Sequence, residues 1–146
     1  MKIPTTRFGL VEVLSSDLIE FPQGLIGMES CHRWVLLADA ESTTLGWLQS
    51  TERPEIALAV VSPRRFVSGY QARVSRRDVE SLELDSSGGS TQVLSIVSHG
   101  EEGLTLNLKA PLVINIDKRV GRQVVTKDDH AVQYALGTTI PFRRSA

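Results

Sequence analysis

LTLNLKAPLVINI, residues 104–116, is the stretch of the sequence that decides the fold. Every second residue from Leu104 to Ile116 is apolar, a strict alternation that predicts a β-strand with one buried face. A straight strand of this length would span roughly 43 Å, so we expect two strand segments that meet at a bend. Pro111 supplies the bend because it has no N–H to donate to a neighbouring strand. The apolar residues keep their parity across the proline, so we expect both segments to turn the same face to the core.

The rest of the chain indicates more short strands, about nine in all. Apolar runs or alternation, bounded by turn residues, predict strands at residues 3–13, 18–21, 32–38, 45–50, 56–61, 70–74, 92–98 and 123–126, with one more near 131–134. Gly9 inside the first of these suggests a bulge. FPQGLIG, residues 21–27, has two glycines and a proline and predicts a tight loop that buries Leu25 and Ile26.

One helix is signalled, at about residues 75–85. Ser75 is a candidate N-cap with Asp78 three residues later, and Val74 can pack on Val79 across the cap. Val79 and Leu82 share one face, and a helix this short must dock on the sheet to be stable. A linker of serine and glycine at 86–90 then returns the chain to the sheet.

These elements contain no alternating βαβ units, which excludes a doubly wound fold. The sequence predicts an all-β, mainly antiparallel fold: a small closed or partly open β-barrel or sandwich with one short α-helix. A length of 146 residues is that of one domain, here 1–146, with a core of its own.

Composition excludes several classes of protein. The formal net charge of −1 excludes a generally basic nucleic-acid binder. The charge is uneven, because residues 1–60 carry a net −4 and residues 61–146 a net +3, which favours docking to charged protein surfaces. Cys31 is the only cysteine, so no internal disulfide can form. With no apolar run of membrane-spanning length and a polar N-terminus, we expect a cytoplasmic protein that does not contact membranes.

Motifs for catalysis, cofactors or metals are not found. The sequence has no G-x-G-x-x-G, P-loop, G-x-S-x-G or H-E-x-x-H pattern. Asp128-Asp129-His130 has no second cluster with ligand spacing, and we interpret it as a solvated turn. Cys31 and His32 would point to opposite faces of a strand, so Cys31 is interpreted as a small buried hydrophobe. We therefore predict no enzyme, no cofactor and no metal.

The candidate partner-binding residues are polar side chains expected at the surface: Glu12, Asp17, Glu20, Glu29, Asn107 and Asn115. The four acidic residues surround the FPQGLIG loop and would form an acidic patch if they converge. The alternative is a solvated face that keeps the protein soluble. The two asparagines lie on the non-core parity of the long strand, either as exposed anchors or as hydrogen-bond partners of a neighbouring loop.

Five motifs occur in the order typical of one family: TRFG (6–9), FPxGLxG (21–27), WLQS (47–50), NLKAPLVIN (107–115) and GRQVV (121–125). In this pattern, which covers nearly the whole chain, the sequence resembles the flagellar assembly factor FliW family. The resemblance implies a small β-barrel-like protein without catalytic residues. It implies binding to newly made flagellin, near the C-terminal region of flagellin, and to the translational regulator CsrA.

The resemblance also implies a regulatory cycle. Once flagellin export frees the protein, it sequesters CsrA, and flagellin translation resumes. We expect a monomer when the protein is free and no direct contact with nucleic acid. Two alternatives remain, a small-ligand barrel and an RNA-binding barrel of the OB type. An aromatic content of 5% counts against the first, and the slightly negative net charge counts against the second.

Overall fold

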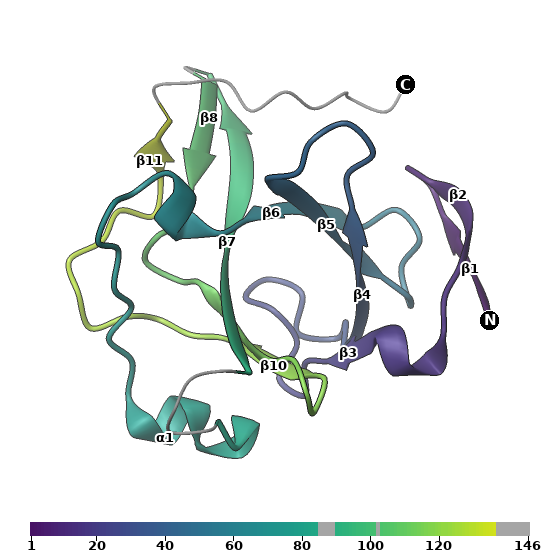
Figure 1. Ribbon diagram of the computed structural model, residues 1–146, viewed down its shortest axis with the longest axis horizontal. Coiled ribbons are helices and arrows are strands. Elements are labelled where there is room, and N and C mark those ends of the chain that lie inside the picture. The colour runs from purple at the N-terminus through teal and green to yellow at the C-terminus, as the bar shows by residue number, and fades with distance from the viewer. Residues whose placement is uncertain (85–89, 102, 137–146) are drawn as a thin grey trace.

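A computed structural model of the chain describes residues 1–84, 90–101 and 103–136, and its centre is a closed ring of strands (Figure 1). The ring runs in the order β9-β7-β6-β5-β4-β3-β10, and β10 returns to β9. Its pairings are antiparallel except that of β10 with β3, so the predicted all-β barrel is confirmed. The ring strands are β3 (Leu18–Glu20), β4 (Arg33–Ala38), β5 (Leu45–Ser50), β6 (Ala57–Val61), β7 (Thr91–Gly100), β9 (Leu112–Asn115) and β10 (Val120–Gln123).

Short elements surround the ring. They are the strands β1 (Lys2–Thr5), β2 (Gly9–Glu12), β8 (Gly103–Leu106) and β11 (Tyr134–Ala135), the helix α1 (Arg76–Val79), and the 3-10 turns η1 (Ser15–Asp17), η2 (Pro63–Arg65) and η3 (Glu80–Leu82). The prediction of a single strand at 3–13 is wrong. The chain instead forms the β1–β2 hairpin, with Gly9 at a φ of +71° where β2 begins. The strand expected at 70–74 is also wrong, because that segment pairs with no strand in the described part of the chain.

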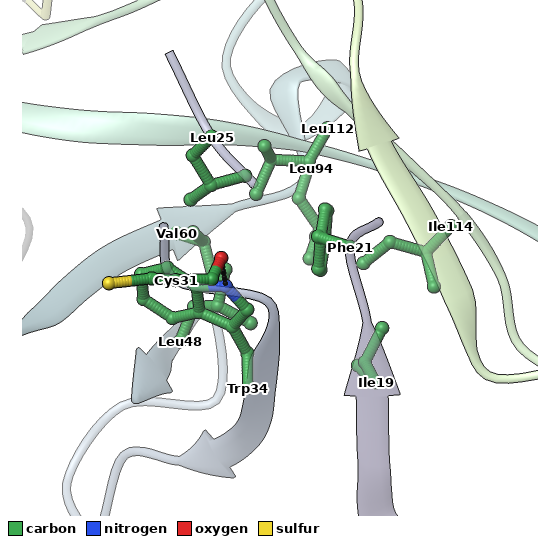
Figure 2. Packing of buried hydrophobic residues seen from close by; sticks show 10 residues of the cluster. All are labelled: Ile19, Phe21, Leu25, Cys31, Trp34, Leu48, Val60, Leu94, Leu112 and Ile114. Carbon is green, nitrogen blue, oxygen red and sulfur yellow. Dashed lines mark hydrogen bonds between the residues drawn. The ribbon is translucent and has the colours of Figure 1, made fainter. Parts of the chain in front are cut away.

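The interior of the ring is filled by a cluster of ten buried side chains, drawn in Figure 2. Trp34 and Phe21 are the largest of them, and the indole N–H of Trp34 donates to the carbonyl oxygen of Cys31 at 3.0 Å. Cys31 is buried, as predicted. Gly121 lets β10 pass over the ring of Phe21, because a Cβ there would lie 2.7 Å from Phe21 Cζ.

The organising stretch does form two strands that meet at a bend. Both β8 and β9 pair antiparallel with β7, and residues 107–111 form the bend between them. The expectation that both segments turn one face to the core is wrong. Leu106 pairs with Val97, and Leu112 pairs with Leu94. Between these two pairs, the bent segment has five residues and β7 has two, a difference of three. An odd insertion exchanges the two faces of a strand.

Consequently, Leu106 and Leu112 lie in different hydrophobic clusters. Leu112 is part of the barrel interior, whereas Leu106 packs outside the ring with residues such as Trp47, Val61 and Tyr70. The even residues from Leu104 to Ile114 are nevertheless all buried, because a cluster of apolar side chains packs on each side of the sheet.

The odd residues of the stretch follow the prediction only before the bend. Thr105, Asn107 and Lys109 are half-buried, but Pro111, Val113 and Asn115 are buried. For Val113 and Asn115, the reason is the segment formed by α1 and η3: Leu82 packs on Val113, and Asn115 donates to the carbonyl oxygen of Leu82.

This helical segment lies where it was predicted but is shorter, covering Arg76–Leu82. Ser75 is its N-cap residue, as predicted, but the Ser75 side chain makes no capping hydrogen bond. Val74 and Val79 both pack against the Leu82 cluster. The expected end of the helix at 85 and most of the linker at 86–90 fall outside the described residues.

Replacing Ile114 by alanine tests the packing of the barrel interior. Ile114 is fully buried, so Ile114→Ala should lower the free energy of unfolding by about 2–5 kcal/mol, measured by urea denaturation. Val125 is exposed, and Val125→Ala should change stability by less than about 0.5 kcal/mol. Equal effects of the two substitutions would contradict this packing.

Candidate partner-binding surface

The loop between β3 and β4 is tight, as predicted. Leu25 and Met28 form an isolated β-bridge inside the loop. Gly24 has a φ of +67°, and a Cβ there would lie 2.5 Å from the carbonyl oxygen of Glu29, so the loop closes tightly on itself only with glycine at this position. Leu25 points into the barrel core (Figure 2), whereas Ile26 is 58% exposed and contradicts the expected burial.

Gln123 fastens this loop to the rest of the barrel. Its Oε1 accepts a hydrogen bond from the N–H of Ile26 at 2.9 Å, and its Nε2 donates to the carbonyl oxygen of Ala110 at 3.0 Å. One side chain of β10 therefore joins the loop to the bend between β8 and β9. Gln123 was expected in a strand at 123–126, and local pattern does not reveal this role, which depends on a contact between residues 97 positions apart.

Two of the predicted acidic residues, Glu20 and Glu29, lie at the two ends of this loop. Both are exposed, as predicted. Glu20 is the last residue of β3 and lies opposite Arg33 of β4, while the carboxylate of Glu29 accepts a hydrogen bond from the N–H of Gly27 at 2.9 Å. The loop thus carries negative charge on both sides of the exposed Ile26.

The other two acidic residues, Glu12 and Asp17, lie further back along the chain. Glu12 is exposed on the β1–β2 hairpin and lies 3.4 Å from the N-terminal ammonium group. Asp17 is half-buried, and its carboxylate accepts a hydrogen bond from the N–H of Leu14 at 2.8 Å. Arg119 also donates to the carbonyl oxygen of Asp17 at 2.6 Å, so a cation lies within this acidic stretch.

The two candidate asparagines are hydrogen-bond partners of neighbouring backbone. Asn107 Oδ1 accepts from the N–H of Ala110 at 2.9 Å and so fixes the bend. Asn115 is 3% exposed, and its amide donates to the carbonyl oxygens of Leu82 and Glu83 at 2.9 and 3.2 Å. Asn115 therefore holds the end of the helical segment on the barrel rather than serving as an exposed anchor.

Sequence reasoning missed the apolar part of this surface. Leu10 is 64% exposed and Leu14 is 67% exposed, on the same segment as Glu12 and Asp17. Leu10 was expected among the apolar residues of the strand at 3–13, but it is exposed on the hairpin. Apolar side chains within a polar rim are typical of protein–protein interfaces.

The Asp128–His130 turn has a structural role that the interpretation as a solvated turn did not include. The carboxylate of Asp128 accepts hydrogen bonds from the backbone N–H of Arg73 at 2.8 Å and from its side chain, which holds the pKa of Asp128 below its ordinary value. His130 Nε2 lies 2.8 Å from the carbonyl oxygen of Gln71. Among the described residues, no group of three or more His, Cys, Asp or Glu could hold a metal ion. In the same residues, no helix is long and apolar enough to cross a membrane.

The carboxylate of Glu52 binds backbone N–H groups at the end of the loop, where β4 begins. Glu52 Oε1 accepts hydrogen bonds from the N–H groups of Arg33 at 2.8 Å and His32 at 2.6 Å. These bonds, chiefly the one from Arg33, hold the pKa of Glu52 below its ordinary value.

Comparison with known proteins gives a consistent result. A family model described as FliW protein matches residues 2–136. A flagellar assembly factor FliW of Bdellovibrio bacteriovorus is 39% identical over 132 residues, covering 89% of this chain and 75% of the relative. The FliW of Natranaerobius thermophilus is 36% identical, covering 86% and 84%. A crystal structure of the flagellar assembly factor FliW superposes with a TM-score of 0.83 at 27% identity, covering 93% of this chain and 96% of the other.

The Glu52 carboxylate should make stability depend on pH. Its pKa is lower in the folded protein than in the unfolded chain, so its stabilising contribution is present above the ordinary pKa and lost as pH falls through the folded-state value. Between about pH 5 and pH 3, the melting temperature of Glu52→Gln should therefore fall less steeply than that of the wild type. Glu101→Gln, at an exposed site, should keep the wild-type slope. Equal slopes for Glu52→Gln and the wild type would contradict this role.

Proposed function

The chain belongs to the FliW protein family, and on this premise we propose that it is a flagellar assembly factor that works by binding other proteins. One observation carries the proposal: the family match spans residues 2–136, and so includes the hairpin, every strand of the barrel and the bend. The protein binds and is not an enzyme, and it needs no cofactor.

The proposed partners are flagellin and the translational regulator CsrA. Flagellin is made in bulk and then exported, so its free concentration in the cytoplasm changes widely. A monomeric protein that binds flagellin and CsrA in competing states converts that change into the amount of free CsrA. When flagellin is exported, the freed protein sequesters CsrA and flagellin translation resumes. Mass action alone drives this cycle, with no chemical modification.

The surface proposed to face CsrA is the acidic surface, defined as Glu12, Asp17, Glu20 and Glu29 with the loop at 21–30. Three of these carboxylates are exposed, and the exposed Ile26 and Leu14 lie beside them in the chain. An RNA-binding regulator carries positive charge that complements such a surface. Because Gln123 and the Leu25–Met28 bridge fix the loop, little entropy is lost when it docks.

The packing and charge of the barrel support protein binding over the two alternative functions. A small-ligand barrel keeps its interior open, but here ten buried side chains fill the interior cluster, Trp34 and Phe21 among them. An RNA-binding barrel needs a basic groove with stacking aromatics, whereas this chain has a net charge of −1 and 5% aromatic residues.

A displacement experiment tests the regulatory cycle. Titrating purified flagellin into a preformed complex of this protein with CsrA should release CsrA, detected as a change in the size-exclusion or fluorescence-anisotropy signal of labelled CsrA. Bovine serum albumin at the same concentration should release none. A stable ternary complex with unchanged affinities would rule the cycle out.

Charge reversal tests the acidic surface. No hydrogen bond or ion pair of the Glu20 side chain occurs within the described residues, so Glu20→Lys should leave the melting temperature close to that of the wild type. Its association with CsrA should be slower, and the difference should shrink as salt screens charges beyond about 8 Å. Glu101→Lys makes the same charge change at the β7–β8 turn and should associate at the wild-type rate. Equal rates for the two variants at low salt would exclude Glu20 from the interface.

A further inference from the structure

The pairing of β6 with β7 stops early, and Pro63 is the reason. The ladder joins Val60 to Ile96 and Val61 to Ser95, so its next hydrogen-bonded step would join Pro63 to Val93. Pro63 has no N–H to donate, and its carbonyl oxygen accepts instead from the N–H groups of Phe66 and Val67 in the η2 turn. The chain therefore leaves the sheet at residue 62, although β7 continues.

The departure of β6 leaves backbone groups on one edge of β7 without a strand partner in the described part of the chain. The N–H of Ile116 donates to the carbonyl oxygen of Ser90, and the N–H of Asn107 donates to that of Ile96. Even residues along β7 thus turn their backbone groups toward β9 and β8, and odd residues turn theirs to the opposite edge. Ser95 meets β6 there, whereas no strand in the described part of the chain pairs with Thr91 and Val93 on that side.

A hollow lies on each face of the sheet at this open edge. The outer hollow measures about 510 Å³ and is lined by residues that include Pro63, Arg64, Tyr70, Ala72 and Val93. The inner hollow measures about 360 Å³ and is lined by residues that include Leu36, Val60, Arg65 and Leu94. Both hollows share Ser62 and Gln92, so they flank the same gap in the sheet.

We propose that the open edge of β7 at residues 91–93 binds an extended segment of a partner protein by β-strand addition. The backbone groups of Thr91 and Val93 supply the main-chain hydrogen bonds, and the two hollows receive alternate side chains of the added strand. This is the division of roles in known strand-addition sites, where the backbone gives affinity and pockets for alternate residues give specificity.

The charges around the gap define the chemistry of the segment. Arg64 lines the outer hollow and Arg65 the inner one, and both are exposed. Neither forms an ion pair within the described residues, and Arg64 Nε donates only to the carbonyl oxygen of Tyr70, at 3.1 Å. Gln92 lines both hollows, and the other lining residues are apolar, aromatic or small polar side chains. The segment that fits has small apolar residues at alternate positions and a carboxylate at one end, next to the two arginines.

This edge is separate from the acidic surface and has the opposite charge, so the inference goes beyond the proposed function. A partner that binds the acidic surface through basic residues has no reason to occupy the edge. The two sites can therefore be tested independently, by substitutions that leave the other site unchanged.

The test uses the full chain and a defined probe, the peptide acetyl-Thr-Val-Thr-Val-Thr-Glu with a free C-terminal carboxylate. Titrating it into ¹⁵N-labelled protein should shift the amide resonances of Thr91 and Val93 and slow their hydrogen exchange, because their backbone groups become paired. A peptide with the same side chains but a fully N-methylated backbone cannot pair and should bind at least about tenfold more weakly. If the amides of Thr91 and Val93 do not respond, or if the N-methylated peptide binds equally well, strand addition is wrong.

Matched charge reversals test the role of Arg64. Arg64→Glu should weaken binding of the probe about three- to tenfold, the range expected when an exposed ion pair is replaced by repulsion. Arg77→Glu makes the same change at an exposed position of α1 outside both hollows and should bind like the wild type. Both variants are first checked for wild-type amide spectra away from the substitution. Equal affinities of the two variants would show that the arginine at the gap does not select the carboxylate and would overturn the proposed segment chemistry.

Discussion

The ring closes because one edge of β7 pairs with two strands in succession. β8 pairs with its C-terminal part and β9 with its N-terminal part, and the three extra residues in the bend exchange the faces between them. Leu104 and Leu106 of β8 therefore pack in the cluster outside the ring, while β9 contributes Leu112 and Ile114 to the interior. Without the bend, a single straight strand would place all its apolar residues on one face, and β9 could not turn to meet β10.

Hydrogen bonds from several directions fix this bend. The phenol of Tyr70 donates to the carbonyl oxygen of Leu108 at 2.7 Å, and burial raises the pKa of Tyr70 to about 12. Lys109 Nζ donates to the carbonyl oxygens of Thr126 and Asp128 at 2.8 and 2.6 Å. Gln123 joins the bend to the loop at 21–30, because its side chain forms hydrogen bonds with Ala110 and with Ile26. The shape of the proposed CsrA-facing loop is thus coupled to the same bend that closes the barrel.

Local pattern predicted most of the strands, because alternation and turn residues act within a few positions. The strand at 45–50 has its predicted bounds, and the bend was predictable from the length of the alternating stretch together with Pro111. Which face Leu106 covers depends on how many residues oppose the bend, and that number is set by β7, not by the bent strand. The hairpin at Gly9 was missed because a glycine within an apolar run indicates a bulge as readily as a turn. Of the candidate site, exposure of Glu12, Glu20 and Glu29 was predictable, whereas the burial of Asn115 depends on a helix that docks from 33 residues away.

Two prolines have opposite consequences in this barrel. Closure normally removes sheet edges, which in open sheets invite pairing with other chains. Pro111 lies at the end of the bend, directly before β9 completes the ring, whereas Pro63 ends the β6–β7 ladder and leaves Thr91 and Val93 without a strand partner on that side within the described residues. A buried core would not require that opening, since a β6 that continued through residue 65 would pair with both positions. The residues after Pro63 are Arg64 and Arg65, and cations at a sheet edge discourage pairing with neutral or basic strands. The same two charges attract a strand that ends in a carboxylate. Arg64 and Arg65 therefore disfavour aggregation through this edge and favour an acidic segment.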